Sequence, residues 1–341
     1  MTWQFQPAQS AFEQYRNRWD ALNAQCGNHV LLDSQFVASL LKHFGNSDVL
    51  LGIREQAPAA MALLRKKSAG IWETFQPSQA PLGLILCGEL GSADGTLAPL
   101  LRSLPGYAVQ VSLLHQDPDF SGFRTASEKG LFERLEYIRT ARIPLAGAFD
   151  EYWNAREGGL RKNNNRLRRR MAEKGLRLDF LAVRQPHQIA SAIKEYGRLE
   201  SKGWKASEGT AVTAENKQGH FYRDLLETFC ARGEGAVYQL LVNGQVIASE
   251  ICLIRKGMLV LLKTAYDEDW SVYSPSFLLR EDILRLLYAE GTVRVYEFYG
   301  PLMDYQLRWT DQVRTLYHLT CYRQSWVRHL KSFAKRLHGS K

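Results

Sequence analysis

Apolar residues in the second half of the chain switch repeatedly between the spacing of strands and the spacing of helices. Ile189, Ile193, Tyr196 and Leu199 lie three or four residues apart, which predicts a helix, whereas shorter runs rich in Val, Ile and Tyr predict strands. Asn243-Gly244, between two such runs, is a strong signal for a two-residue β-hairpin. The predicted order is a strand, two helices, three strands, a helix, a strand, a short helix and a strand, over residues 176–183, 186–202, 216–231, 236–242, 246–254, 258–266, 279–289, 293–299, 304–309 and 315–322.

The first half shows a blurred version of the same order. A helix is expected over 1–25, and Asp33 is expected to cap a helix that follows a short strand over 30–32. Further strands and one helix are expected over 49–54, 59–65, 70–75, 84–87, 97–104, 109–114 and 131–143. The loop QPSQAPLG (76–83) occupies the place that YSPSFLL (273–279) holds later, which suggests an old internal duplication.

Length and this duplication favour two domains. A chain of 341 residues with a hinge near Pro144 predicts an N-terminal domain over 1–148, a C-terminal domain over 149–323 and a tail over 324–341. The tail is basic and amphipathic, with an apolar stripe of Trp326, Leu330, Phe333 and Leu337.

The net charge of +9 is local. RKNNNRLRRR, from Arg161 to Arg170, carries six positive charges, and the tail carries five more. Such clusters suit phosphate-bearing ligands, tRNA or an anionic membrane surface, although a solvated helix face is the plainer interpretation of the first and a docked helix that of the tail.

The cysteine pattern and the absence of targeting signals bear on the cellular compartment of the protein. The five cysteines are scattered without a C-x-x-C pair, so reduced core thiols are expected and no metal site. The N-terminus has no signal-peptide pattern, and no apolar run is long enough to span a bilayer. A cytoplasmic location is expected, with peripheral contact at the inner membrane as an alternative.

The stretch from Leu259 to Ala289 reads as strand, Ser-Pro-Ser turn and helix. Ser274 or Ser276 is a candidate N-cap, and Pro275 suits the first turn. A helix N-terminus leaves backbone N–H groups unpaired, so this turn is a candidate anion site; an ordinary capped helix is the more common explanation of such a pattern.

Four strings carry a family resemblance: ESKGWK (200–205), QVIASEICL (245–253), LLKTAYDEDWSVYSPSFLL (261–279) and YEFYGPLMDYQLRW (296–309). With the order of elements, they resemble the Gcn5-related N-acetyltransferase (GNAT) superfamily, in the CelD-like branch of cellulose and exopolysaccharide biosynthesis proteins, which is related to the Fem aminoacyl transferases. The resemblance covers about 150–323 well and the first 145 residues only by order. It implies an α+β fold of tandem GNAT-like domains, with mixed, mostly antiparallel sheets flanked by helices and a degenerate first domain.

The resemblance also implies acyl-CoA, typically acetyl-CoA, as the donor, with its pyrophosphate held by backbone N–H groups between Tyr273 and Leu278. The donor-binding residues implied are Lys263, Tyr273, Ser274, Pro275, Ser276 and Phe277. The chain departs from the family here, because no Gly lies between Gly257 and Gly291, where a Gly-rich loop is usual. An aminoacyl-tRNA donor therefore remains an alternative.

Acyl transfer to an amine needs a base, an acid for the departing thiolate and donors for the oxyanion. Tyr305 is the candidate acid, and Glu250 and Glu297 are candidate bases, because buried carboxyls gain basicity. Aromatic packing and cross-strand ion pairs, such as Glu250 with Lys263, are the structural alternatives. The candidate acceptor residues are Trp204, Lys205, Tyr266, Asp267 and Trp309. For Trp204, Lys205 and Trp309 a packing cluster at a helix end is an equal alternative.

Three functions remain open from the sequence. The first is an acyl-CoA-dependent N-acyltransferase acting on an amine in polysaccharide or cell-envelope biosynthesis. The second is a Fem-like transferase that uses aminoacyl-tRNA. The third is a non-catalytic accessory protein of a membrane polysaccharide synthase. The acceptor, the acyl chain and the oligomeric state are left open.

Overall fold

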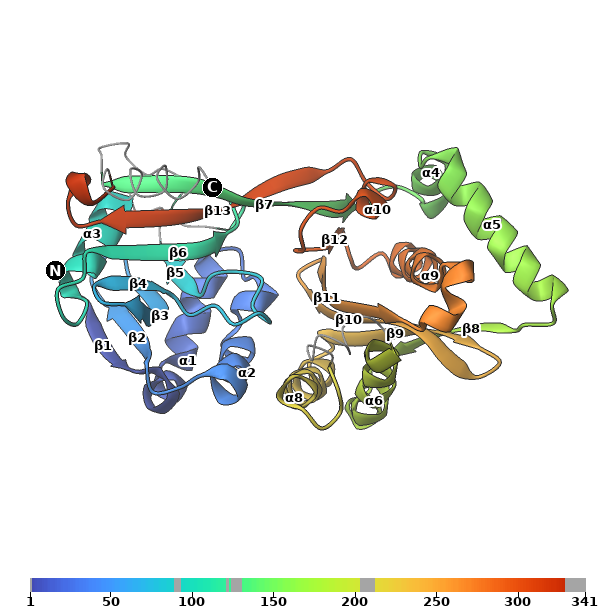
Figure 1. The fold of residues 1–341 in the computed structure, drawn as a ribbon, viewed down its shortest axis with the longest axis horizontal. Helices are drawn as coiled ribbons and strands as arrows, with labels where there is room; N and C mark the ends of the chain where they lie inside the picture. The colour runs from blue at the N-terminus through green and yellow to red at the C-terminus, as the bar shows by residue number, and fades with distance from the viewer. Residues whose placement is uncertain (1, 89–92, 121–122, 124–130, 203–211, 329–341) are drawn as a thin grey trace, which may run out of the picture. The chain divides into compact units, whose positions relative to one another are not determined.

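The computed structural model describes residues 2–88, 93–120, 123, 131–202 and 212–328 (Figure 1). The chain divides into two compact units. The first comprises Met1–Arg139 with Thr315–Lys341, and the second comprises Thr140–Arg314. The predicted tail lies largely outside the described residues, which end within it at 328.

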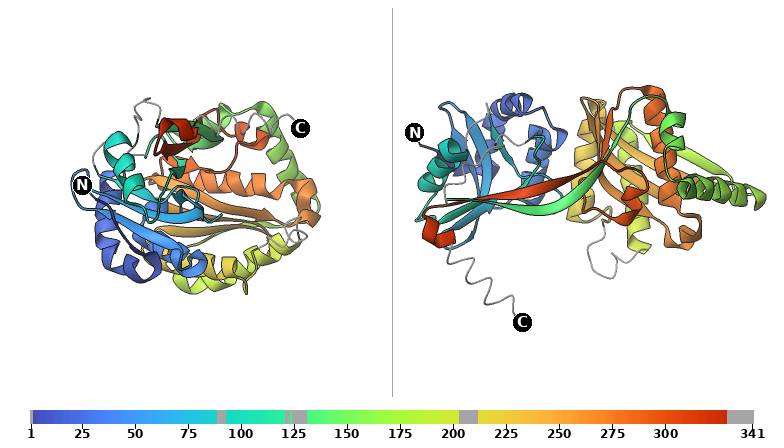
Figure 2. Two further views of the ribbon diagram at one scale, coloured as in Figure 1. Left: turned by 60° about the vertical axis from the view of Figure 1, so that its left-hand side comes forward. Right: turned by 90° about the horizontal axis from the view of Figure 1, so that it is seen from above.

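The first unit is a mixed sheet flanked by helices. Its strand order is β1-β2-β3-β4-β6-β13, with β5 paired to β3, and among the pairs that the structure describes in this unit only β4–β6 is parallel. Figure 2 shows α1 and α2 on one face and α3 on the other. The elements of the first unit are β1 (Gln4–Pro7), α1 (Ala8–Gln25), η1 (Val30–Leu32), α2 (Ser34–Phe44), β2 (Val49–Arg54), β3 (Ala60–Ser68), β4 (Ile71–Thr74), β5 (Ile85–Cys87), α3 (Ala93–Ser103), β6 (Gln110–Gln116), the first part of β7 (Phe132–Pro144) and β13 (Val313–Tyr322).

The second unit repeats this pattern of pairing. Its strand order is β8-β9-β10-β11-β12-β7, and only the β11–β12 pair is parallel. Its elements are the last part of β7, then α4 (Phe149–Asn154), α5 (Gly158–Glu173), β8 (Leu178–Val183), α6 (Pro186–Lys202), α8 (Lys217–Ala231), β9 (Gly235–Val242), β10 (Gln245–Arg255), β11 (Met258–Tyr266), η2 (Glu268–Tyr273), α9 (Pro275–Glu290), β12 (Val295–Glu297) and α10 (Asp304–Leu307). The expected α+β architecture, with two mixed and mostly antiparallel sheets, is confirmed.

Each sheet is completed by a strand from the other half of the sequence. β13, expected as the last strand of the second domain, pairs with β6 in the first unit, with Leu319 opposite Leu113. The end of β7 pairs with β12 in the second unit, with Ile143 opposite Tyr296. The units therefore differ from the predicted ranges 1–148 and 149–323. Periodicity identifies a strand but not its partner, which explains the difference.

The short turns follow the sequence. Asn243-Gly244 joins Val242 to Gln245, and both turn residues have positive φ, as a type I′ hairpin requires. Asp33 accepts the backbone N–H of Gln35 and caps α2 as predicted. Two expectations were wrong. Residues 30–32 form a 3-10 turn, because the His29 ring accepts the Leu31 N–H, and residues 4–7 form a strand before the first helix.

Helices cover both faces of the second sheet. α6 and α8 lie on one face and α9 lies on the other, and α9 packs apolar residues such as Leu279, Ile283 and Leu287 into the core (Figure 2). Within the part of the chain that the structure describes, no helix has both the length and the apolar character to cross a membrane.

The strand exchange predicts where a substitution in β13 acts. Leu319→Ala removes a side chain that is 1% exposed in the core of the first unit. We expect it to cost about 2–5 kcal/mol. Hydrogen exchange should accelerate at the amides of residues 111–113, opposite β13. The half-buried Thr315→Ala in the same strand is the control, and acceleration confined to residues 140–314 would contradict the assignment.

Candidate active site

Strands β11 and β12 separate after three paired residues. Met258, Leu259 and Val260 pair with β12, which ends at Glu297, whereas β11 continues to Tyr266 paired with β10 alone. A β-bulge lies at the point of separation, because Lys263 faces Ile251 but Leu261 faces Cys252. A bulge increases local twist, which turns the second half of β11 away from its neighbour.

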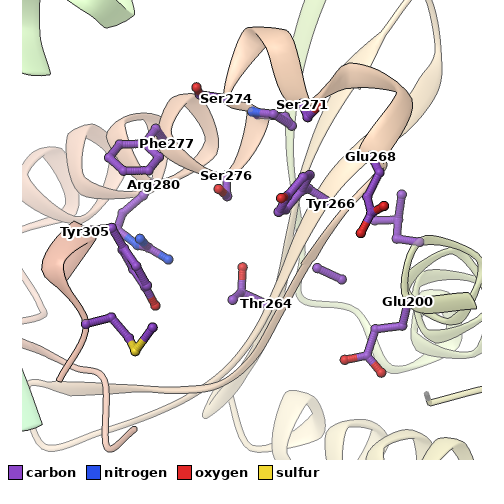
Figure 3. A pocket seen from close by; sticks show the side chains of 14 residues that line it. Glu200, Thr264, Tyr266, Glu268, Ser271, Ser274, Ser276, Phe277, Arg280 and Tyr305 are labelled. Carbon is purple, nitrogen blue, oxygen red and sulfur yellow. The ribbon is translucent and has the colours of Figure 1, made fainter. Parts of the chain in front are cut away.

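A cavity of about 600 Å³ lies beside the separated half of β11, within the range of small-molecule sites (Figure 3). Its walls come from the end of α6, the second half of β11, the turn from η2 into α9, and α10. The lining residues are Leu199, Glu200, Thr264, Ala265, Tyr266, Glu268, Ser271, Ser274, Pro275, Ser276, Phe277, Arg280, Met303 and Tyr305.

The turn into α9 presents fewer backbone donors than expected. The Ser274 N–H donates to Ser271 O, the Phe277 N–H donates to Ser274 O, and Pro275 has no N–H. Since α9 begins at Pro275, the Ser276 N–H has no intrahelical acceptor and remains available at the cavity. The Ser274 side chain makes no capping bond, and Ser271, Ser274 and Ser276 all line the cavity.

Ser274 adopts the left-handed conformation, with φ 48° and ψ 54°. This conformation is uncommon for a residue other than Gly and costs of order 1 kcal/mol. The turn therefore takes a shape that Gly would favour without containing one. The absence of Gly from this turn therefore does not prevent a left-handed backbone at Ser274.

Tyr305 lies on α10 and lines the cavity, as expected for the candidate acid. Its ring is 6.3 Å from that of Phe277, and the Arg280 guanidinium carbon lies 5.7 Å from its ring centroid. Tyr266, the acceptor residue predicted on β11, also lines the cavity and is 40% exposed.

Glu250 is buried and bonded on both oxygens. Its Oε1 lies 2.5 Å from Arg280 Nη2, and its Oε2 accepts the Tyr296 hydroxyl at 2.6 Å. Glu250 does not line the cavity, whereas Arg280 does. This geometry does not fit a base that contacts substrate. The cross-strand alternative with Lys263 does not fit either, since Glu250 lies opposite Thr264 and its cation comes from α9.

Arg280 remains charged although its side chain is buried. Burial by itself lowers the pKa of Arg280. The Glu250 carboxylate and the Tyr296 and Tyr305 hydroxyls raise this pKa by more than burial lowers it, so the net shift is upward. Burial also raises the pKa of Tyr296, and the charge on Glu250 adds to this effect, so Tyr296 remains a neutral hydrogen-bond donor.

Glu297 is buried on β12 and does not line the cavity. Arg314 Nη1 lies 2.8 Å from its Oε2, and Arg142 Nη1 lies 3.9 Å from its Oε1. The ion-pair alternative describes this carboxylate better than a role as base.

The remaining predicted site residues divide between the cavity wall and its surroundings. Asp267 is fully buried and accepts from Arg198 and Lys202, while its Oδ1 caps η2. Tyr273 and Trp309 belong to the core, and Lys263 lies 4.0 Å from Glu200. Ser274, Pro275, Ser276 and Phe277 line the cavity. Trp204 and Lys205 lie outside the described residues.

Several lining residues were not predicted, and two had a usable signal. Arg280 is spaced three and four residues before Ile283 and Leu284, which places it on the buried stripe of α9. Glu200 lies four residues after Tyr196, which places the two side chains on the same face of α6. In the structure Glu200 accepts the Tyr196 hydroxyl at 2.8 Å and the Val212 N–H. Thr264, Glu268 and Ser271 carried no signal beyond their place in the strand and turn.

The corresponding place in the first unit is filled by protein. β4 and β6 also pair over three residues, but the Gly83 N–H then donates to His115 O and the Leu114 N–H donates to Thr74 Oγ1. A Cβ at Gly83 would lie 2.0 Å from Leu114 O, so only Gly permits this approach. The segment QPSQAPLG thus closes the gap whose counterpart is open in the second unit.

The basic stretch forms α5 and divides between two roles. Arg168 Nη2 lies 2.7 Å from Asp282 Oδ1, and Asn164 donates to Glu281 Oε2, so part of the stretch docks the helix on α9. Lys162, Arg166 and Arg169 are exposed.

Comparison with known proteins bears on both the site and the fold. Residues 158–307 match the family described as Acetyltransferase (GNAT) domain. No curated protein sequence matches the chain.

The fold is similar to several solved structures at low sequence identity. The C-terminal domain (DUF2156) of a protein named as a lysylphosphatidylglycerol synthetase from Agrobacterium fabrum has a TM-score of 0.56 and 11% identity, covering 92% of this chain and 96% of that one. FemX has a TM-score of 0.58 and 8% identity, covering 92% and 97%. A conserved protein of unknown function from Bacteroides thetaiotaomicron has a TM-score of 0.54 and 12% identity, covering 93% and 99%.

The class of protein follows from these findings. The second unit carries the matched acetyltransferase domain, and the first unit repeats its strand pairing, so the chain has a tandem GNAT-like fold. The matched domain also contains the cavity, so the acyltransferase activity is assigned to this domain.

The buried pair predicts a specific pattern of stability. Glu250→Gln and Arg280→Met each leave one partner buried without its counterpart, and we expect each to cost roughly 3–5 kcal/mol in urea unfolding. The double variant should cost much less than the sum. Arg285→Met removes a half-exposed cation from the same helix and leaves the buried Glu281 with Asn164 and Arg168, so it should cost less than either single variant. Additive costs within about 0.5 kcal/mol would show that the two groups do not interact.

Proposed function

We propose that the cavity of the second unit transfers an acyl group from acyl-CoA to an amine. The observation that carries the proposal is the gap between β11 and β12, with the N-terminus of α9 and Tyr305 on its walls. The residues fit a diphosphate in part. The Ser276 N–H and the Ser271, Ser274 and Ser276 hydroxyls are donors, and the helix dipole favours an anion at this end.

Each wall has a role in this reaction. The turn from Ser274 to Phe277 would hold the pyrophosphate, and Tyr305 would protonate the departing thiolate. Glu200 and Glu268 line the side of the cavity next to α6 and η2, so we place the cationic acceptor there (Figure 3). Two carboxylates facing one cavity favour an ammonium group over an anionic acceptor. The CelD-like resemblance of the sequence extends the proposal to amines of polysaccharide or cell-envelope biosynthesis.

Calorimetry with acetyl-CoA tests the proposal. Ser276→Asp places a carboxylate at the helix N-terminus in the cavity wall, and we expect it to weaken acetyl-CoA binding at least about tenfold by repelling the diphosphate. Ala289→Asp adds the same charge at the exposed far end of α9 and should leave the affinity unchanged. If the unmodified protein gives no heat of binding with millimolar acetyl-CoA, the donor assignment fails.

A second candidate is transfer from aminoacyl-tRNA, favoured by the exposed cations of α5 and by the fold shared with FemX. Binding to tRNA would weaken steeply with salt, because cations on the protein displace counterions from the phosphates. Replacing Lys162, Arg166 and Arg169 together by Gln should reduce both the affinity and its salt slope on this account, whereas Arg168, which binds Asp282, is left in place.

Binding measurements with acetyl-CoA and with tRNA distinguish the two candidate functions. The acyl-CoA account predicts that this triple variant binds acetyl-CoA normally and that the unmodified protein shows no specific binding of tRNA. Specific, salt-dependent tRNA binding without acetyl-CoA binding would favour the second candidate. Binding of neither donor would favour the accessory role.

A further inference from the structure

The Arg280 side chain divides its contacts between the core and the cavity. Its Nη2 bonds to Glu250, and its Nε lies 3.4 Å from the Tyr296 hydroxyl. Among the residues that the structure describes, these are the only hydrogen-bond partners of the guanidinium, which leaves Nη1 for the cavity that Arg280 lines. Figure 3 shows the side chain pointing from α9 into the space between Tyr305 and Thr264.

The guanidinium is held rigidly. Its central carbon lies within 6.0 Å of four aromatic ring centroids, those of Tyr296, Phe298, Tyr305 and Trp309. Only 1% of the side chain is exposed, and Glu250 is fully buried. Buried ion pairs contribute little net stability compared with apolar residues of the same size, so stability alone does not explain why a cation is fixed here.

The charges around the cavity indicate what Nη1 can stabilise. Glu250 already balances Arg280, and the other ionic groups on the wall are Glu200 and Glu268. An acceptor with a permanent negative charge close to these carboxylates is disfavoured, whereas the diphosphate of the donor is placed on the turn from Ser274 to Phe277. A fixed donor suits an oxygen that is neutral at rest and becomes negative during the reaction.

We propose that Arg280 is a catalytic residue that stabilises the oxyanion of acyl transfer, and that Glu250 and Tyr296 are positioning residues that hold it. This inference rests on the proposed function. It replaces the expectation that Glu250 is the base. The carboxylate orients the guanidinium and does not contact substrate.

The acceptor ammonium gives one proton to solvent, and its nitrogen forms a bond to the thioester carbonyl carbon, while the π pair of C=O moves onto the oxygen beside Arg280. When that pair returns, the C–S bond breaks and sulfur leaves with the bonding electrons, taking a proton from the Tyr305 hydroxyl. The new amide nitrogen sheds its extra proton, which restores Tyr305 through water.

The test uses a spectroscopic signal of the bound donor in addition to turnover. Infrared difference spectra of acetyl-CoA with and without ¹³C in the carbonyl report the stretching frequency of the thioester in the full-length protein. We expect the frequency to lie below its value in water, because Arg280 polarises the bond, and to return toward the water value in the Glu250→Gln/Arg280→Met double variant. This double variant removes both charges, so that neither is left unpaired in the core.

Kinetics and controls complete the test. The double variant should lower kcat by about 10²–10³-fold, with acetyl-CoA affinity within about threefold of the unmodified protein. Arg285→Met, on the exposed side of the same helix, should keep both the frequency and kcat. A double variant that binds acetyl-CoA with unchanged carbonyl frequency and unchanged kcat would overturn the inference alone. Failure of the unmodified protein to bind acetyl-CoA would overturn the inference together with the proposed function.

Discussion

The separation of β11 from β12 is the constraint on which the site depends. A strand edge buried in protein must satisfy its backbone N–H and C=O groups, and beyond Val260 none of the described strands pairs with β11 on that side. In the first unit the segment around Gly83 supplies these hydrogen bonds, since the Gly83 N–H donates to His115 O. The second unit leaves the space open as a cavity. The two units therefore share one strand pattern and differ in what fills the gap.

The open gap also explains why charges are buried behind it. Arg280 and Glu250 come from a helix and a strand on either side of the core, and their pairing places a fixed positive group at the cavity wall without a net charge. The aromatic rings around the guanidinium exclude water from it. A buried group held in this way changes little in position during a reaction, which is the condition for electrostatic stabilisation of a developing charge.

The sequence predicted the parts of the fold that are local. The Asn243-Gly244 hairpin, the Asp33 cap and the helix after Pro275 follow from turn chemistry and periodicity. The resemblance named Tyr305 on a short helix, and the structure shows that it lines the cavity. The exchange of β7 and β13 was not predicted, because strand partners are set by contacts distant in sequence. Glu250 and Arg280 lie 30 residues apart in the sequence, and no spacing rule relates a strand residue to a helix residue at that separation. For Glu250 and Glu297 the sequence left open a catalytic base or a cross-strand ion pair, and both carboxylates are ion-paired, Glu250 with Arg280 instead of Lys263.

A crystal structure of the protein with bound acetyl-CoA tests the central claim most directly. The account predicts pyrophosphate density at the Ser276 N–H and acetyl density between Thr264 and Tyr305, beside the separated half of β11. Acetyl-CoA bound elsewhere, with the gap filled by side chains or closed by renewed pairing of β11 and β12, would contradict it.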